Sequence, residues 1–426
     1  MRTPPSPANP SSGALAIPAS GARLDTRRLR GLIITNFSAS VAFTAMYSTQ
    51  PILPQISDEY HVMPAQAGLT ILAVTFALAF ASLAAGRIAD AIGTRRMMLI
   101  CGTLLSIFSI AVPLAPTFPI LVSLRAAQGL AVPGITIAGL AYLHNELPAS
   151  WRGRVSGFYI AANTIGGLVG RLGVGLTVEP LGWRASLSLV AGWVIMGTLL
   201  LAATPASQRK AEMATPTTAS ATTRPPLAVI FRRLWWAPFI GGTVFFPFLT
   251  VFSYSPYRLE GAPFHLSPTI SSLIYLVYLL GAVASPIAGN ISDRAGRRPT
   301  IQVSLAIAAI GLVCTLVDLL PLIAIGLALV CVGSLMAHVV ANASVSEAAN
   351  PLGAQARATA LSLYTLGFYL GGGLGSFVPG LALVDFGWYG VAALCALAIA
   401  SAFLCSLATS ARPERGGYVE PTATAG

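Results

Sequence analysis

The sequence predicts an all-α polytopic membrane protein with twelve transmembrane helices arranged as two six-helix halves. Three observations predict this fold: long apolar stretches recur along the 426 residues, the basic residues fall mostly on one side of the resulting topology, and a short charged motif occurs twice. Hydrophobic residues make up 55% of the chain, charged residues only 9%, and the mean hydropathy is +0.75. Water-soluble globular proteins are much less apolar than this.

The first six spans follow a polar N-terminal segment. A hydrocarbon core of roughly 30 Å requires about 20 helical residues, so we interpret each apolar stretch of that length as a span. Residues 1–30 are rich in Pro, Ser and Ala and lack the apolar core of a cleavable signal, which predicts a disordered cytoplasmic tail. The half at 31–203 holds the predicted spans 31–55, 68–89, 97–115, 119–143, 155–178 and 183–203.

The last six spans follow a segment of linker composition. Residues 204–235 begin with "TPASQRKAEMATPTTASATTRPP" and divide the chain near its middle, which predicts a cytoplasmic linker. The half at 236–410 holds the predicted spans 236–258, 269–291, 300–319, 321–345, 358–383 and 387–408. Residues 411–426 are then a cytoplasmic C-terminal tail.

The distribution of the basic residues behind the net charge of +11 predicts how the protein is oriented in the membrane, and it does not indicate a nucleic-acid partner. With both termini on one side, Arg184 and Arg258 fall on the opposite side, Arg125 and Arg171 fall within spans, and all other basic residues fall on the side of the termini. The positive-inside rule makes that side cytoplasmic. The sequence thus predicts a multi-pass membrane protein with both termini in the cytoplasm, and the resemblance described below implies a bacterial inner membrane.

The charged motif lies at the end of the second span of each half. "GRIADAIGTRRM" begins at residue 86 and "GNISDRAGRRPT" at residue 289, and both fit G-x-x-x-D-x-x-G. A second match lies further on, because "FYIAANTIGGLVGRLGVG" (158–175) and "LYTLGFYLGGGLGSFVPG" (363–380) share a Tyr and a Gly-Gly-x-x-Gly pattern at nearly the same offset. Two matches at nearly one spacing predict two homologous halves that run parallel.

Each motif position has a physical interpretation. Gly86 and Gly289 would let neighbouring backbones approach closely, and Gly93 and Gly296 suit helix C-caps. Asp90 and Asp293 are placed to accept from helix N-terminal N–H groups or to pair with arginine. Basic loops alone would also follow from the positive-inside rule, but that rule does not explain why the Gly and Asp spacing occurs twice.

These motifs resemble the major facilitator superfamily, whose loop signature is G-x-x-x-D-x-x-G-R-[RK]. The second copy matches it closely, and the first has Thr94 in place of the first basic residue. "LRAAQG" (124–129) resembles the fourth-helix motif of that family. "QPILP" (50–54), "FSYSPYRL" (252–259) and "NTIGGLVGRL" are similar to segments of bacterial inner-membrane permeases related to drug and sugar efflux proteins. The resemblance covers about residues 31–410.

The resemblance implies a secondary transporter that moves a small organic solute by alternating access between its halves. It also implies that the repeated loops act as a conformational latch, with charge pairs that bridge the halves in one state and break in the other. The implied latch residues are Gly86, Asp90, Gly93, Arg95, Arg96, Gly289, Asp293, Gly296, Arg297 and Arg298.

Arg125 and Arg171 are costly at their predicted depth, so each is a candidate for the substrate pathway, with Gln128 beside Arg125. Snorkelling of the two side chains to the headgroups is the alternative. Two fixed positive charges favour an anionic substrate over a lipophilic cation. Drug/proton antiporters of the family usually carry Gly-Pro in the fifth helix, whereas Gly170 here precedes Arg171, which disfavours the alternative of a multidrug/proton antiporter.

Proton coupling requires a group that changes charge, and the predicted topology leaves no Asp or Glu within the membrane. His338 is the candidate, with Asn342 one turn later on the same face, although a hydrogen-bonded packing histidine is an equal alternative. Tyr254 is a further candidate for lining the pathway, but aromatic residues near helix ends are often interface anchors.

Other function classes fit less well. A membrane-embedded enzyme would need a cluster such as H-E-x-x-H or a Ser/Lys pair within spans, and Lys210 in the linker is the only lysine. Two non-identical halves do not build a channel's ring of charges or carbonyls. We therefore expect no catalytic residue, no metal and no cofactor, with a proton gradient as the energy source. The expected partners are a small-molecule substrate, protons and the lipid bilayer, without nucleic acid, for a monomer.

Overall fold

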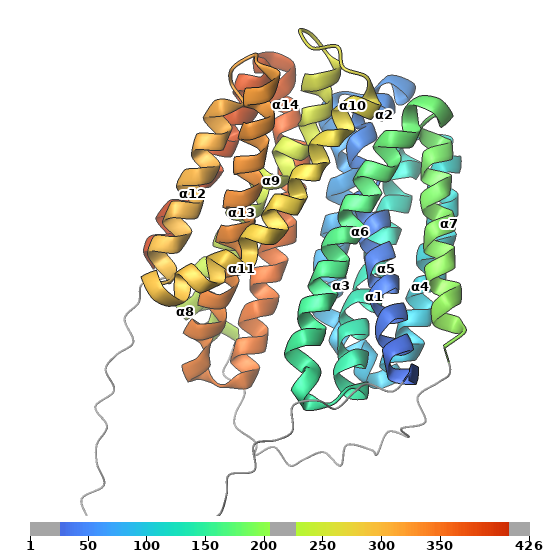
Figure 1. Ribbon diagram of the computed structural model, residues 1–426, viewed down its shortest axis with the longest axis vertical. Coiled ribbons are helices and arrows are strands. Elements are labelled where there is room, and N and C mark those ends of the chain that lie inside the picture. Colours follow the sequence, from blue (N-terminus) through green and yellow to red (C-terminus); the bar gives the residue numbers. More distant parts are fainter. Residues whose placement is uncertain (1–25, 205–226, 409–426) are drawn as a thin grey trace, which may run out of the picture.

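The computed structural model describes residues 26–204 and 227–408, and the regular structure in these ranges is helical, without strands. Figure 1 shows two helical bundles side by side. The long helices of the first bundle are α1 Thr26–Tyr47, α3 Pro64–Ile92, α4 Thr94–Ala111, α5 Phe118–Glu146, α6 Arg152–Leu181 and α7 Trp183–Ala202. Those of the second are α9 Trp236–Glu260, α11 Tyr278–Ala295, α12 Arg297–Cys314, α13 Leu320–Ala349 and α14 Ala354–Ala408.

Shorter elements connect the long helices. They are the α-helices α2 Leu53–Tyr60, α8 Leu227–Leu234 and α10 Pro268–Ser272, and the 3-10 turns Gln50–Ile52, Val112–Leu114, Ala149–Trp151, Leu273–Val277 and Asn350–Leu352. Residues 48–52 interrupt the first span between α1 and α2, and the 3-10 turn at 273–277 joins α10 to α11.

The helices of the described ranges are consistent with twelve spans. Nine helical stretches there are long and apolar enough to cross a membrane. One of them is α14, which Gly387 divides because its φ of 59° and ψ of −150° are not helical. These nine stretches do not include α6, which carries three arginines, or α12, which begins with two. Figure 1 nevertheless shows both helices beside the other long ones.

The predicted domain boundaries are only partly within the described residues. Most of the 1–30 tail, most of the 204–235 linker and the 411–426 tail lie outside them, so these three assignments stay predictions. Where the chain is described, α1 begins at Thr26 rather than at residue 31, and α8 forms within the predicted linker. Arg and Leu are good helix formers, which explains why "TRRLR" extends the first helix.

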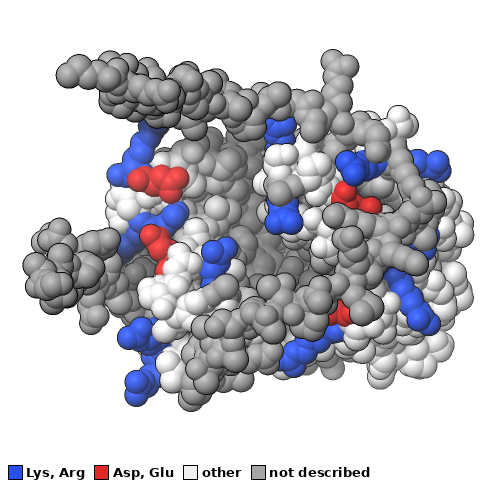
Figure 2. Space-filling view, turned by 90° about the horizontal axis from the view of Figure 1, so that it is seen from below, with Lys and Arg blue, Asp and Glu red and all other residues white. Residues whose placement is uncertain are grey.

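We name the two ends of the bundle by their charges. The basic end holds the start of α1, the end of α7 and the loops at Gly93 and Gly296, and Figure 2 shows more blue than red side chains on this face. The acidic end holds α2 and α10, together with Asp58, Glu59, Glu179, Glu260, Asp318 and Asp385. The charge asymmetry predicted from the sequence is therefore visible in the fold.

The repeat is confirmed by backbone geometry. Gly93 caps α3 with a φ of 89°, and Gly296 caps α11 with a φ of 93°. Both values lie in the region that side chains with a Cβ rarely adopt, as the C-cap prediction requires. Gly182 and Gly387 also share positive φ values at the equivalent boundary between the fifth and sixth spans of each half.

The prediction that Gly86 and Gly289 allow close helix approach is wrong for this structure. A Cβ atom added to either residue would meet nothing within 4 Å. Gly86 is exposed at the end of α3, and Gly289 is half-buried in α11. The reason is that each residue lies near the basic end, while the halves make their hydrogen bonds with each other toward the acidic end.

The contact between the halves is polar at the acidic end. Gln55 donates to Glu260 at 2.9 Å, and Ser57 shares a hydrogen bond of 2.5 Å with Tyr257. Deeper in the bundle, Gln50 donates to Ser253 at 3.0 Å and Ser376 donates to the Gly68 carbonyl at 3.2 Å. The two halves are thus closed against each other at this end.

Gly175 provides a test of this closed contact. A Cβ atom at Gly175 in α6 would overlap the side chain of Ser272 in α10, so Gly175→Val should separate the halves at the acidic end. We expect a longer distance between spin labels at Asp58 and Ala262, which are exposed residues of different halves, in a cysteine-free background. Gly173→Val is the matched control, because its Cβ would meet open space. Unchanged distances in both variants would contradict the closed contact.

Candidate functional site

Arg125 lies where the first span is interrupted. Because α1 ends at Tyr47, the carbonyls of Ala45 and Met46 lie in its last turn, and the Ala45 carbonyl accepts from the Ser48 hydroxyl at 2.9 Å. Arg125 from α5 donates to both, at 2.8 Å from Nη1 to the Ala45 oxygen, and its Nε donates to the Thr70 carbonyl of α3 at 3.2 Å. Its side chain is fully buried. A cation at a helix C-terminus also interacts favourably with the helix dipole.

Gln128 completes the environment of Arg125. Its Oε1 accepts from Nη1 of Arg125 at 2.6 Å, and its Nε2 donates to Ser109 of α4 at 2.9 Å. Every guanidinium nitrogen of Arg125 therefore already donates to the protein. Arg125 and Gln128, both predicted for the substrate pathway, join α1, α3, α4 and α5.

Arg171 lies on the other side of the same interruption, between the two halves. Its Nε donates to Oε1 of Gln50, and its Nη1 donates to the Gly167 carbonyl at 2.8 Å. The guanidinium carbon lies 3.8 Å from the ring centre of Tyr47 in α1 and 4.4 Å from that of Tyr278 in α11. The cation is thus stacked between one aromatic ring from each half.

One nitrogen of the Arg171 guanidinium, Nη2, makes no direct hydrogen bond within the part of the chain that the structure describes, although the Tyr47 side chain interacts with the guanidinium. The buried hydroxyl of Tyr278 has no hydrogen-bond partner there either. Within the same ranges, no carboxylate forms an ion pair with Arg125 or Arg171. The site between the halves therefore combines an uncompensated positive charge with an unused hydroxyl group.

An aromatic wall extends from this charge through the second half. The ring of Tyr278 lies 5.1 Å from that of Phe248, which lies 5.4 Å from Phe245. Phe245 stacks on Phe368 of α14 at 3.8 Å with an angle of 12° between the planes. Phe368 then lies 4.2 Å from the ring of His338 in α13. A continuous series of rings therefore connects Arg171 with His338.

His338 is held at the far end of the aromatic wall. Its Nδ1 shares a hydrogen bond of 2.8 Å with the hydroxyl of Tyr364, which also donates to the His338 carbonyl at 3.1 Å. His338 is half-buried, as is Asn342 one turn further along α13. The histidine is therefore oriented by a tyrosine, and part of its surface remains accessible.

Tyr254 lies in the packing between helices. It is fully buried, and its hydroxyl donates to the Ser376 carbonyl at 2.5 Å, which joins α9 to α14. The predicted role of Tyr254 in lining a pathway thus has no support in its contacts.

The repeated loops make their contacts within each half. Arg95 donates to the carbonyls of Ala202 and Thr204 at the end of α7, at 3.3 and 2.6 Å. In the second copy, Arg297 lies 3.5 Å from Asp293 and 3.3 Å from Glu347. Asp90 is exposed and forms no ion pair with any described residue.

The other basic residues of these loops differ in exposure: Arg96 is exposed, and Arg298 is half-buried. The pairs that we identify in this state therefore do not bridge the halves.

Sequence reasoning missed Gln50 and Tyr278 as parts of the site. Gln50 belongs to the "QPILP" segment, which the resemblance to permeases includes without assigning Gln50 a role. A glutamine next to a proline within an apolar span does indicate a buried polar group. Tyr278 stands in the apolar segment "LIYLVYLLGAV" of the second half. Nothing in its local sequence indicates that it stacks on an arginine of the first half.

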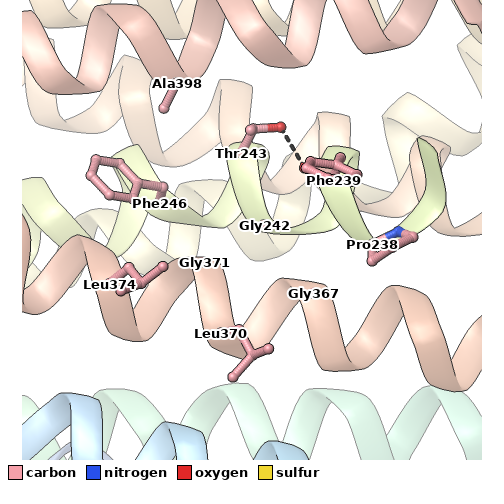
Figure 3. A pocket seen from close by; sticks show the side chains of 10 residues that line it. All are labelled: Pro238, Phe239, Gly242, Thr243, Phe246, Gly367, Leu370, Gly371, Leu374 and Ala398. Carbon is pink, nitrogen blue, oxygen red and sulfur yellow. Dashed lines mark hydrogen bonds between the residues drawn. The ribbon is translucent and has the colours of Figure 1, made fainter. Parts of the chain in front are cut away.

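A separate apolar groove of about 320 Å³ lies between α9 and α14 (Figure 3). Its polar side chain is Thr243, whose hydroxyl donates to the Phe239 carbonyl at 2.7 Å. None of its ten lining residues is ionisable, and none belongs to the Arg171 site. The groove therefore lacks the groups that would recognise a charged solute.

Comparison with known proteins agrees with this architecture. The family model described as Major Facilitator Superfamily matches residues 35–262 and 261–424. The inner membrane transport protein YnfM of Escherichia coli is 31% identical over 376 residues, which cover 86% of this chain and 88% of that protein. The multidrug resistance protein Stp of Mycobacterium tuberculosis is 30% identical over 165 residues, which cover 38% of this chain and 30% of Stp.

A solved structure shares the whole fold. The inward-facing, unoccupied crystal structure of a bacterial homologue of the human lysosomal transporter Spinster superposes with a TM-score of 0.73 at 17% identity. The superposition covers 91% of this chain and 98% of that one. The two homologous halves, the repeated loop motif and these matches together show that the chain belongs to the major facilitator superfamily and is a membrane transporter.

Proposed function

We propose that this transporter exports a small organic anion from a bacterial cytoplasm in a proton-coupled step, by alternating access between its two halves. The observation that carries the proposal is Arg171, whose charge lies between the halves, has no carboxylate partner and has one unpaired edge. The protein is placed in the inner membrane with both termini in the cytoplasm, so the basic end faces the cytoplasm and the acidic end faces outward.

The contacts support a state that is closed toward the outside. The hydrogen bonds between Gln55 and Glu260, and between Ser57 and Tyr257, seal the acidic end. At the opposite end, Gly86 and Asp90 are exposed, as expected when the halves stand apart there. A solute reaching Arg171 in this state would come from the cytoplasm, which is the loading step that export requires.

The electrostatics favour an anion. Arg125 and Arg171 place two positive charges near the interruption of the first span, and dipoles and aromatic faces stabilise them without neutralising them. In a poorly solvated site, a carboxylate or phosphate that accepts from Nη2 of Arg171 would offset the cost of burying this charge. A guanidinium also recognises such a group by geometry, which an ammonium does not.

Export of lipophilic drugs is the second candidate, because Stp carries the name of a multidrug resistance protein. The apolar and aromatic surface of the second half would suit such compounds. The two uncompensated arginines argue against it for cations, since a like charge is repelled in a site of low polarity. Binding of lipophilic cations in preference to organic anions would favour this second candidate.

Substitutions at the two arginines should have different effects. We expect Arg171→Lys to weaken anion binding at least tenfold, roughly 1.4 kcal/mol, because the ammonium loses the stacked plane and the open edge. Arg125→Lys should instead destabilise the protein by about 3 kcal/mol. The anion affinity of the folded variant should stay within about threefold of the parent value. Calorimetric titration and thermal unfolding of the purified variants separate the two effects. Equal losses of affinity in both variants would contradict this assignment.

His338 is the proposed proton carrier. It is a titratable side chain on the aromatic wall, it is partly accessible, and Tyr364 fixes its orientation. A histidine can gain and lose a proton in the physiological range, which arginine cannot do. A protonated His338 would add a third positive charge to the site, so proton release and anion release are linked by electrostatics.

Removing the titratable group should uncouple transport from the proton gradient. We expect His338→Gln to abolish accumulation driven by a pH gradient in proteoliposomes while exchange down a substrate gradient continues. Tyr364→Phe is a control that keeps the imidazole but removes its partner, and it should lower the coupled rate without abolishing it. If His338→Gln accumulates substrate as the parent does, another group carries the proton.

Asp90 tests the proposed latch. Asp90 makes no ion pair with a described residue in this state, so Asp90→Asn should not change the stability of this state. The substitution should destabilise the alternative state in which the basic end closes. We expect slower transport at equal expression, together with greater accessibility of basic-end positions to a thiol reagent. Asp385→Asn, which changes an exposed carboxylate at the acidic end, should have neither effect. Transport by Asp90→Asn at the parent rate would exclude the latch.

A further inference from the structure

We propose that the anion is an aromatic carboxylate, with its carboxylate at Arg171 and its ring against the aromatic wall. This inference rests on the proposed function, because it assigns a substrate class to the same site. It goes further by specifying the apolar part of the substrate, which the arginine alone does not define.

The polar end of the site has two unused donors on one stacked unit. Among the described residues, Nη2 of Arg171 makes no direct hydrogen bond and the hydroxyl of Tyr278 has no partner, and the centre of the Tyr278 ring lies 4.4 Å from the guanidinium carbon. Tyr278 is 95% buried, so its free hydroxyl is costly unless a ligand accepts from it. A carboxylate has two acceptor oxygens and carries the compensating charge. One small anionic group would therefore satisfy both donors.

The surface further along the wall, which connects to Arg171 through Tyr278 and Phe248, is aromatic. Phe245 and Phe368 are nearly parallel, and Tyr369 meets Phe368 edge-on at 5.4 Å. Phe368 and Tyr369 are only half-buried, which leaves part of each ring available for contact. Planar rings gain from stacked and edge-to-face contacts beyond the burial of area, whereas a saturated ring of similar size does not. The wall thus favours a planar ring over an aliphatic one.

Other solute classes match this combination less well. A sugar would need several hydrogen-bonding groups along its length, but Phe245, Phe248 and Phe368 offer none. A short aliphatic acid would satisfy Arg171 and leave the wall unused. A lipophilic cation would suit the wall but not the two buried arginines. The aromatic acid is the class that uses both parts of the site.

Matched ligands test the charge and the ring separately. We would titrate the full-length purified protein in lipid nanodiscs with benzoate, 3-phenylpropionate and indole-3-acetate by calorimetry. Benzamide removes the charge of benzoate but keeps its ring, and cyclohexanecarboxylate keeps the charge but removes the planarity. We expect the best aromatic acid to bind about threefold to tenfold more tightly than its saturated counterpart. Benzamide should bind at least tenfold more weakly than benzoate.

Three variants assign the effects to residues. Tyr278→Phe keeps the stacked ring and removes the hydroxyl, and it should weaken the binding of aromatic acids by about fivefold. Phe368→Leu should reduce the preference for benzoate over cyclohexanecarboxylate to less than twofold. Phe239→Leu, on an exposed ring in the separate groove, is the matched control and should preserve the preference.

The outcomes distinguish this inference from the proposed function. If saturated and aromatic acids bind equally well, or if only aliphatic anions bind, the aromatic class is wrong while the anion site stands. If amides bind as tightly as acids, or only lipophilic cations bind, the anion function itself fails. A preference for aromatic acids that survives Phe368→Leu would show that the wall is not the recognition surface.

Discussion

The structure depends on accommodating two arginine side chains inside a membrane protein, with no carboxylate from residues 26–204 or 227–408 to neutralise them. Arg125 is surrounded by backbone carbonyls and an amide oxygen, and Arg171 by an amide oxygen, a carbonyl and two aromatic faces. These groups are available because the first span is interrupted after Tyr47, which frees helix carbonyls and places Gln50 between the halves. The interruption thus supplies polar groups that surround both charges. This role explains why an otherwise apolar bundle has irregular backbone at this depth.

The same environment separates the roles of the two charges. Arg125, in α5, donates to two neighbouring helices of its own half, and each of its guanidinium nitrogens forms a hydrogen bond, so it stabilises the packing of α5 against α1 and α3. Arg171 has a free edge and touches Tyr278 of the other half. Separation of the halves at the acidic end would remove that ring from the guanidinium. Under the proposed function, this cation–π contact would link a solute bound at Arg171 to the position of the halves.

Much of the architecture follows from the sequence because it depends on local properties. Helix length, apolar character and the sign of loop charges define the spans and their orientation, and the rarity of buried arginine identifies Arg125 and Arg171. The partners of these arginines are distant in sequence, so the sequence does not reveal whether a nitrogen is occupied, as in Arg125, or free, as in Arg171. Gly86 shows a second limit, because the neighbours of a glycine depend on how distant helices are arranged, and here a Cβ atom at Gly86 would meet open space.

Several positions of the two halves correspond, but the position of Arg171 differs between them. Tyr159 and Tyr364 are equivalent, and each donates to a carbonyl of the preceding long helix of its half. Gly175 and Gly380 are equivalent, and each packs tightly against the opposite half. Arg171 corresponds to Ser376, whose hydroxyl donates to the Gly68 carbonyl across the interface. The repeat therefore places both residues at the same junction, but only the first half uses it for a charge. The second half faces that charge with aromatic rings, so a solute that binds at Arg171, as we propose, would contact both halves.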